Sequence, residues 1–188
     1  MPNWCFNKVT FIHSDPAEIK RVAEAYGRDA LFSEFAPCPQ DLVDTIAGSF
    51  GDTEEQAALE AKQVSNRDKY GYANWYDWCV ANWGTKWDIN SNDDQAAPYS
   101  EDRIELYFDT AWSPPIPFYE KMEELGFTVD GYYYEPGMGF CGRYNDGDDD
   151  YYEIEGNAEW VLENIPGDID DTFSISDNME GLEEDEQE

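Results

Sequence analysis

The feature that most constrains the fold of this chain is the alternation of apolar and polar residues in two distant segments. Such a pattern is typical of β-strands that have one face covered by the rest of the protein. Residues 5–12 alternate in this way, and so do residues 103–108, where Ile104, Leu106 and Phe108 share one side. Each segment is long enough for a strand and too short for a typical helix. Both are predicted to belong to one sheet.

Helix signals lie between these two strands. Asp15 and Pro16 favour a helix start, and Gly27 favours its end. Residues 53–64 are rich in Ala, Glu, Gln and Lys, whereas residues 73–82 carry several aromatic side chains at helical spacing. The last two segments are interpreted as helices that lie against the sheet.

The order of the remaining elements predicts the fold class. Residues 87–90 are predicted to be a short strand beside the second alternating segment, and a proline-rich stretch then opens a helix that ends at Gly126. Residues 127–134 form the next strand. Without a helical insertion at about residues 40–83, the order is β-α-β-β-α-β, the ferredoxin-like sandwich. The predicted class is therefore α+β.

The chain continues beyond this core with extra antiparallel strands. Residues 138–144 and 151–155 are predicted to be strands, and residues 157–164 a short helix. We expect residues 1–173 to form a single ferredoxin-like domain. The acidic residues 174–188 are expected to be a disordered, solubilising tail.

The net charge of the chain restricts the kinds of partner that it can bind. The chain holds 43 Asp and Glu against 11 Lys and Arg, a net charge of −32, and no base follows Arg143. Such an excess repels nucleic acid and anionic membranes and favours a cationic partner. Residues 1–7 contain no targeting signal, and no apolar run approaches the ~18 residues of a membrane span. A soluble, cytoplasmic protein is expected.

Four short motifs stand out in order along the chain. They are Met1-Pro2-Asn3-Trp4-Cys5, Trp83-Gly84-Thr85-Lys86-Trp87-Asp88, Thr110-Ala111-Trp112-Ser113-Pro114-Pro115 and Glu135-Pro136-Gly137-Met138-Gly139-Phe140-Cys141-Gly142. With these motifs the chain resembles the YubB ferredoxin-like family of small phage and plasmid proteins, over about residues 1–145. The resemblance implies a ferredoxin-like core and a phage or plasmid origin, and for a phage protein the host cytoplasm. It implies no reaction.

The same motifs also have a structural interpretation, which we favour. Their tryptophans are large enough to close one face of a small sheet, and their glycines and prolines suit turns. Lys86 is the residue that departs from this interpretation, because it is a lone cation between two tryptophans. An ion pair with Asp88 or another carboxylate is expected, and a binding group is the alternative.

Signatures of an enzyme or a cofactor are absent. His13 is the only histidine and has no nucleophile nearby in the sequence, and neither a GxSxG elbow nor a phosphate-binding glycine loop occurs. No cofactor is therefore expected, and the chain is not expected to be an enzyme. The four cysteines form no CxxC pair and are expected to be free thiols.

A cluster of aspartates invites a calcium interpretation, since hard cations bind carboxylate oxygens. Residues 146–150 read Asp-Gly-Asp-Asp-Asp. However, Tyr151 stands where an EF-hand loop requires glycine, and Asn157 stands where it requires glutamate. A solvated turn between two edge strands is the alternative that we favour, although weak cation binding stays open.

The acidic surface itself is the best candidate site. A net charge of −32 equals the phosphate charge of about 16 base pairs. We therefore expect a non-enzymatic DNA mimic that inhibits a basic, nucleic-acid-binding host protein such as a restriction, CRISPR or recombination nuclease. The expected partner-binding carboxylates are Asp146, Asp148, Asp149, Asp150, Glu153, Glu155, Glu159 and Glu163.

Neighbouring aromatic residues extend this candidate surface. Five tyrosines could add contact area, unless they simply cover the sheet: Tyr132, Tyr133, Tyr134, Tyr151 and Tyr152. The alternative function is an accessory phage or plasmid protein whose acidity only gives solubility. A small enzyme or a cation-binding protein is the less favoured choice.

Overall fold

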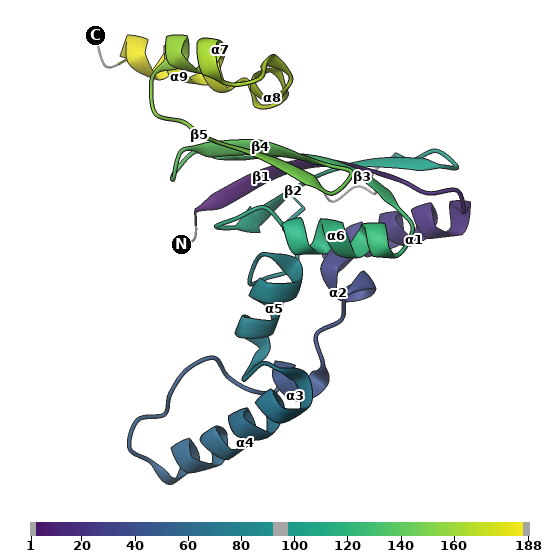
Figure 1. The fold of residues 1–188 in the computed structure, drawn as a ribbon, viewed down its shortest axis with the longest axis vertical. Coiled ribbons are helices and arrows are strands. Elements are labelled where there is room, and N and C mark those ends of the chain that lie inside the picture. Colours follow the sequence, from purple (N-terminus) through teal and green to yellow (C-terminus); the bar gives the residue numbers. More distant parts are fainter. Residues whose placement is uncertain (1–2, 92–97, 186–188) are drawn as a thin grey trace.

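The structure, a computed structural model, describes residues 3–91 and 98–185. Along the chain the elements are β1 (Trp4–Ile12), α1 (Pro16–Tyr26), α2 (Leu31–Phe35), α3 (Gln40–Val43), α4 (Glu54–Tyr70), α5 (Trp75–Trp83), β2 (Arg103–Ala111), α6 (Ile116–Glu124), β3 (Thr128–Glu135), β4 (Phe140–Asn145), β5 (Asp148–Glu153), α7 (Ala158–Asn164), α8 (Gly167–Phe173) and α9 (Ile175–Asp185). Figure 1 shows one sheet with helices on both sides.

The five strands form an antiparallel sheet in the order β2-β1-β3-β4-β5. β1 pairs with β2 through Trp4↔Ala111 and with β3 through Phe6↔Tyr134. Because β1 separates β2 from β3, the unit β2-α6-β3 is a split β-α-β unit. The strands that follow, β4 and β5, extend the sheet beyond β3 through two hairpins.

Residues 87–90 do not form the strand that the sequence predicts. Of this segment, Asn90 forms a single antiparallel bridge to Asp109 of β2. The Asp88 carboxylate accepts hydrogen bonds from the backbone N–H groups of Phe32 (2.8 Å) and Ser33 (2.9 Å) in α2. The segment still runs beside β2, where the β-α-β-β-α-β order requires its second strand. The ferredoxin-like order therefore persists with one strand reduced to a bridge.

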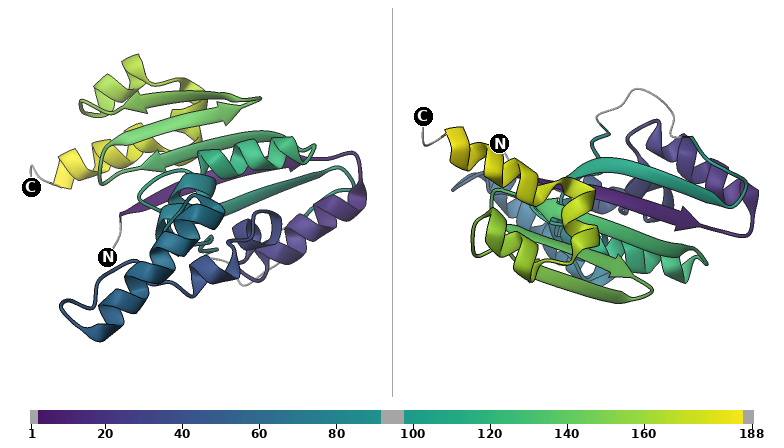
Figure 2. Two further views of the ribbon diagram at one scale, coloured as in Figure 1. Left: turned by 60° about the horizontal axis from the view of Figure 1, so that its bottom comes forward. Right: turned by 90° about the horizontal axis from the view of Figure 1, so that it is seen from above.

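One sheet face packs on α1 and α6 (Figure 2). The alternate residues Val9 and Phe11 of β1 are fully buried there, as the sequence predicts. They meet Phe118 of α6, whose ring centroid lies 6.5 Å from that of Phe11 in an edge-to-face arrangement. Asp15 begins α1 by accepting a hydrogen bond from the Ala17 N–H. This side holds the larger part of the core.

The opposite face packs on α7, α8 and α9, and here the predicted tail is wrong. The predicted tail begins at Ser174, but Ile175–Asp185 form helix α9, and Ile175 is fully buried. Asp170 holds the start of this helix through two hydrogen bonds, from the Ser176 N–H (2.8 Å) and hydroxyl (2.7 Å). Burial of this apolar residue at the first position of α9 attaches the segment to the sheet. The acidic composition of the segment alone does not predict this attachment. Residues 186–188 lie outside the described part of the chain.

The region predicted as a helical insertion contains α3, α4 and α5, which project away from the sheet (Figure 1). Thr53 caps the start of α4, and Gly71 ends it with φ +82°. Asn66 joins α4 to its surroundings by donating from Nδ2 to the Thr45 hydroxyl (3.0 Å) and the Ala73 carbonyl (3.1 Å). Among the described residues, none of the helices combines the length and apolarity that crossing a membrane requires.

Candidate functional site

The acidic candidates begin at the hairpin between β4 and β5. Asp146 and Gly147 form its two-residue loop with φ +50° and +85°, which suits the Asp-Gly preference of tight hairpins. β5 then presents Asp148, Asp149 and Asp150 as exposed residues at the edge of the sheet. Beyond β5, exposed carboxylates continue into α7. We call the eight predicted residues the acidic edge: Asp146, Asp148, Asp149, Asp150, Glu153, Glu155, Glu159 and Glu163.

These carboxylates are divided between two faces of β5. Asp148 and Asp150 lie on the side of α7, α8 and α9, whereas Asp149 and Glu153 lie on the other side, because side chains alternate along a strand. Glu155 lies outside the strand, although residues 151–155 are predicted to form one, since β5 ends at Glu153. The candidates on β5 therefore lie at the edge of the sheet but on both of its faces, whereas Glu159 and Glu163 lie on α7.

Charge on the acidic edge is not neutralised by the protein. None of its eight carboxylates forms an ion pair with Lys or Arg in the described residues. Arg143 lies opposite Asp150 in the sheet, but its guanidinium binds Asp130 (2.9 Å) and Asp168 (3.2 Å) instead. The carboxylates of the acidic edge thus have no cationic partner within the described part of the chain.

Asp149 is the member with an internal contact. Its carboxylate accepts a hydrogen bond of 2.7 Å from the Tyr133 hydroxyl. Burial of this end of the side chain raises the pKa of Asp149, although the residue as a whole is exposed. Asp149 therefore has a structural role besides any role in binding.

The tyrosines mostly cover the sheet. Tyr133 is fully buried and Tyr134 is 9% exposed. Tyr132 and Tyr152 pack partly buried against the cluster formed by α7, α8 and α9. Tyr151, with half of its surface exposed, remains available beside the acidic edge.

The groups weighed for catalysis or metal binding have structural surroundings. His13 accepts the Asp15 N–H at Nδ1 (3.0 Å), and its ring packs 4.6 Å from that of Phe127. Within the described residues, no group of three or more His, Cys, Asp or Glu could hold a metal ion. All four cysteines are free thiols, as predicted, with Cys38 half-buried and the others buried.

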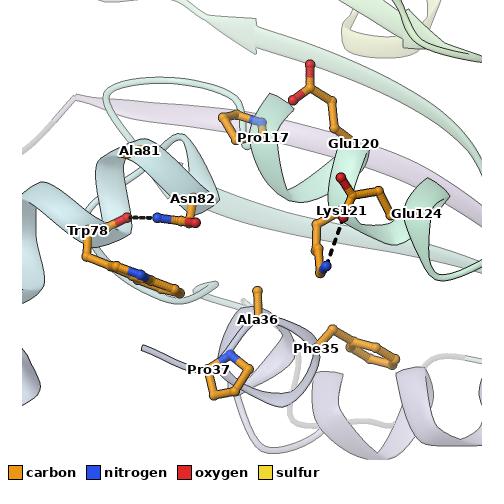
Figure 3. Close-up of a pocket in the computed structure, with 10 residues that line it drawn as sticks. All are labelled: Phe35, Ala36, Pro37, Trp78, Ala81, Asn82, Pro117, Glu120, Lys121 and Glu124. Carbon is orange, nitrogen blue, oxygen red and sulfur yellow. Dashed lines mark hydrogen bonds and ion pairs between the residues drawn. The ribbon is translucent and has the colours of Figure 1, made fainter. Parts of the chain in front are cut away.

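A pocket of about 460 Å³ opens between α2, α5 and α6 (Figure 3). Phe35 and Trp78 contribute apolar surface to it. Its cation, Lys121, is paired with Glu124 at 2.8 Å. Asn82 donates from Nδ2 to the Trp78 carbonyl within its own helix. The pocket contains no nucleophile beside a general base, so its lining indicates no reaction.

The four sequence motifs meet at one corner of the molecule. The Trp112 N–H donates to the Asn3 carbonyl (3.0 Å), and the ring centroid of Trp4 lies 6.5 Å from that of Trp87. A Cβ on Gly137 would lie 2.5 Å from the Asn3 amide nitrogen. Met1 and Pro2 lie outside the described residues. Motifs that are distant in sequence thus form one structural unit.

The middle two motifs interlock most tightly. The Thr85 hydroxyl donates to the Ala111 carbonyl (3.0 Å), and the Ser113 hydroxyl donates to the Gly84 carbonyl (2.6 Å). Gly84 has φ +83°, and a Cβ there would lie 2.7 Å from Cδ of Pro117. We call this unit the motif corner: Asn3, Trp4, Gly84, Thr85, Lys86, Trp87, Ala111, Trp112, Ser113 and Gly137.

The ion pair predicted between Lys86 and Asp88 is not formed, because Asp88 binds the backbone of α2. The Lys86 ammonium lies 3.9 Å from the ring centroid of Trp87. Sequence spacing alone hides this outcome, since the groups that attract Asp88 are far away in the sequence.

Comparison with known proteins addresses the fold. Residues 82–163 match the family model described as a ferredoxin-like domain in Api92-like protein. The chain therefore contains a ferredoxin-like domain and is of the α+β class. The crystal structure of protein Api92 from Yersinia pseudotuberculosis is similar with a TM-score of 0.40 and 12% identity, over 84% of this chain and 99% of that one. No curated protein matches the sequence.

Proposed function

We propose that the chain is a non-enzymatic protein that binds a basic, nucleic-acid-binding protein through the acidic edge. The observation that carries this proposal is that eight exposed carboxylates, from the β4–β5 hairpin through edge strand β5 to α7, have no cationic partner among the described residues. Unneutralised carboxylates attract and steer a cationic surface. A host defence protein that binds DNA or RNA is the partner class that we infer.

The spacing of the carboxylates supports this choice. Alternate residues of a strand are about 6.6 Å apart, and residues four apart in a helix rise by about 6 Å. Asp148 and Asp150 have the first spacing, and Glu159 and Glu163 have the second. Both are about twice the 3.4 Å rise between phosphates of one DNA strand. A groove lined by Lys and Arg could therefore meet charge at regular intervals.

An accessory role without a partner is the second candidate, and the position of β5 favours it. β5 is an edge strand, and charged side chains at an edge prevent pairing with strands of other molecules. In that case the same carboxylates would protect the fold from aggregation. The two functions differ in whether the position of the charge matters for binding.

Two matched variants separate these functions. The first replaces Asp148, Glu155, Glu159 and Glu163 by Lys, which leaves Asp149 and its hydrogen bond intact. The second replaces Asp52, Glu60, Asp68 and Glu101, which are exposed carboxylates elsewhere. Each substitution adds two charges, so both variants have a net charge of −24.

The measurement is capture from a host lysate at low and high salt, followed by competition of the captured protein against a 16-base-pair duplex. We expect the wild-type chain and the second variant to displace the duplex and the first variant to fail. Thermal unfolding checks that all three are folded. Equal competition by the two variants would mean that bulk charge suffices, and capture of no cationic protein would favour the accessory role.

A further inference from the structure

The motif corner exposes aromatic surface that folding leaves uncovered. Trp87 and Trp112 each keep 44% of their surface exposed, and Tyr76 of α5 keeps 43%. Trp and Tyr are enriched among the residues that carry binding energy, and exposed apolar patches mark interaction sites. This surface is distinct from the acidic edge, which lies at the opposite side of the sheet order.

Lys86 gives this surface a positive charge. Its ammonium lies over the ring of Trp87, and it forms no ion pair with a carboxylate in residues 3–91 and 98–185. The adjacent carboxylate, Asp88, already accepts three backbone N–H groups. Of the cations without an ion pair among the described residues, Lys86 is the one that lies over the ring of Trp87 and lines a pocket. The charge is therefore available to an anion.

A pocket of about 200 Å³ lies beside this cation. It is lined by Tyr76, Val80, Thr85, Lys86, Trp112 and Ser113, together with Gly84 and Ala111. An apolar cavity of about 150 Å³ accommodates benzene. The pocket thus has room for one aromatic ring and a short chain, with aromatic walls on the side of Trp112 and Tyr76.

The backbone holds the walls of this pocket in place. Trp112 has φ +75°, a conformation that residues other than glycine rarely adopt. Hydrogen bonds hold the peptide before it, from its N–H to the Asn3 carbonyl and from the Thr85 hydroxyl to the Ala111 carbonyl. The hydroxyl of Ser113, which follows it, donates to the Gly84 carbonyl. Backbone in such conformations concentrates at binding sites, where the surrounding structure imposes it.

We propose that the motif corner binds a small aromatic carboxylate. The Lys86 ammonium pairs with the carboxylate, and the ring contacts Trp112 and Tyr76. A small anion is favoured over a nucleic acid or an acidic protein, because a large polyanion would also meet the acidic residues that cover the molecule. The site is independent of the acidic edge and of the function proposed for it.

The first test uses 3-phenylpropionate, followed by tryptophan fluorescence and by the NMR shifts of the indole N–H groups. We expect saturable binding that is about tenfold weaker for the neutral 3-phenylpropionamide, which cannot form the ion pair. Propionate, which lacks the ring, should bind at least tenfold more weakly as well. No saturable change up to about 10 mM 3-phenylpropionate, or equal binding of the amide, would overturn the proposal.

Lysine variants test the assigned cation. Lys86→Met should weaken binding about tenfold, whereas Lys86→Arg keeps the charge and should retain it. Lys20→Met is the matched control, because Lys20 is exposed on α1 and paired with Glu24. Its binding should stay unchanged, and an equal loss in both Met variants would contradict the assignment to Lys86.

Two further arms identify the source and separate the two proposals. Gly-Gly-Phe with a free carboxylate tests a protein C-terminus, and the same peptide as an amide is its control. Tighter binding than 3-phenylpropionate indicates a C-terminus, and weaker binding indicates a free metabolite. The variant with Lys at Asp148, Glu155, Glu159 and Glu163 should still bind 3-phenylpropionate, so failure at the acidic edge leaves this site standing. Loss of 3-phenylpropionate binding in that folded variant would overturn the independence of the site.

Discussion

The motif corner and the acidic edge differ in how closely their residues are held. In the motif corner, Gly84 leaves no room for a methyl group, and Trp112 is fixed in a left-handed conformation. In the acidic edge, all eight residues are exposed, and within the described residues the carboxylate of Asp149 is held by a hydrogen bond from Tyr133. One region is defined by geometry and the other by charge.

This difference indicates which kind of ligand each region can bind. Fixed walls and a single cation suit a small ligand of defined shape, whereas unpaired charges along an edge suit a large cationic surface. A long-range charge interaction tolerates displacement of a carboxylate by a few ångströms, but a contact between rings does not. Substitutions should therefore disturb the motif corner far more than the acidic edge.

The largest effect is expected for Gly84→Ala. The new Cβ would meet Pro117 Cδ at 2.7 Å and the Pro114 carbonyl oxygen at 2.9 Å, at a positive φ. Strain and overpacking together should lower the free energy of unfolding by about 4 kcal/mol. Gly71→Ala is the control, since Gly71 has φ +82° but nothing within 4 Å, and about 1 kcal/mol is expected. Urea unfolding measures both; equal losses would contradict the packing argument.

The next largest loss of stability is expected in α9, in the acidic C-terminal region. Ile175 is fully buried at the start of α9, so Ile175→Ala should cost about 3 kcal/mol. Exposed Leu162 in α7 offers a control, because Leu162→Ala should cost less than about 0.5 kcal/mol. Both are measured by urea unfolding. If Ile175→Ala left the stability unchanged, the prediction of a disordered tail would stand.

A smaller change in the free energy of unfolding is expected when a carboxylate that forms an ion pair is replaced. The hydrogen bond from Arg21 to Glu34 lowers the pKa of Glu34. A lowered pKa contributes stability above the unfolded value, and this is lost as the pH falls through the folded value. Glu34→Gln should therefore cost up to about 1 kcal/mol at pH 7 and nothing near pH 2. Asp148→Asn is the control, because Asp148 forms no ion pair in the described residues and should cost less than about 0.5 kcal/mol at pH 7. Chemical unfolding across pH measures the effect of Glu34→Gln.

The smallest change in stability is expected along β5 itself. Replacing Asp148 and Asp150 by Asn should alter the free energy of unfolding by less than about 0.5 kcal/mol, because both side chains are exposed and form no ion pair in the described residues. Light scattering should nevertheless show more association, since the edge loses its charge. Replacing Asp52 and Asp68 instead is the control. Equal association in both variants would show that β5 needs no special protection.

Sequence signals that act over a few residues predicted the structure well. Asp15 and Thr53 begin helices as their side chains suggest, and Asp146-Gly147 forms the expected turn. The alternation in β1 and β2 gave the buried face of the sheet. Each of these outcomes depends on backbone groups close in sequence, so local physics suffices.

Signals that depend on distant partners were missed for physical reasons. Asp88 could not be assigned to α2, because the N–H groups that bind it lie more than fifty residues away. The same limit hid the contact between Asn3 and Trp112 and left the motif corner as separate patterns. Ile175 was overlooked because the acidic composition around it outweighed one apolar residue. The acidic edge was read from composition, and its division between two strand faces required the register of β5.

The place of β1 within the sheet also affects how the chain can fold. β1 is synthesised first, yet it pairs with β2 through Trp4↔Ala111 and with β3 through Phe6↔Tyr134. During synthesis this strand must wait, with both edges unpaired, while the intervening helices are made. Sheets closed by such distant pairings fold slowly, because loop closure costs entropy before the pairing is formed. Folding should thus be limited by the pairing of β1 with β2 and β3, and not by the helices between them.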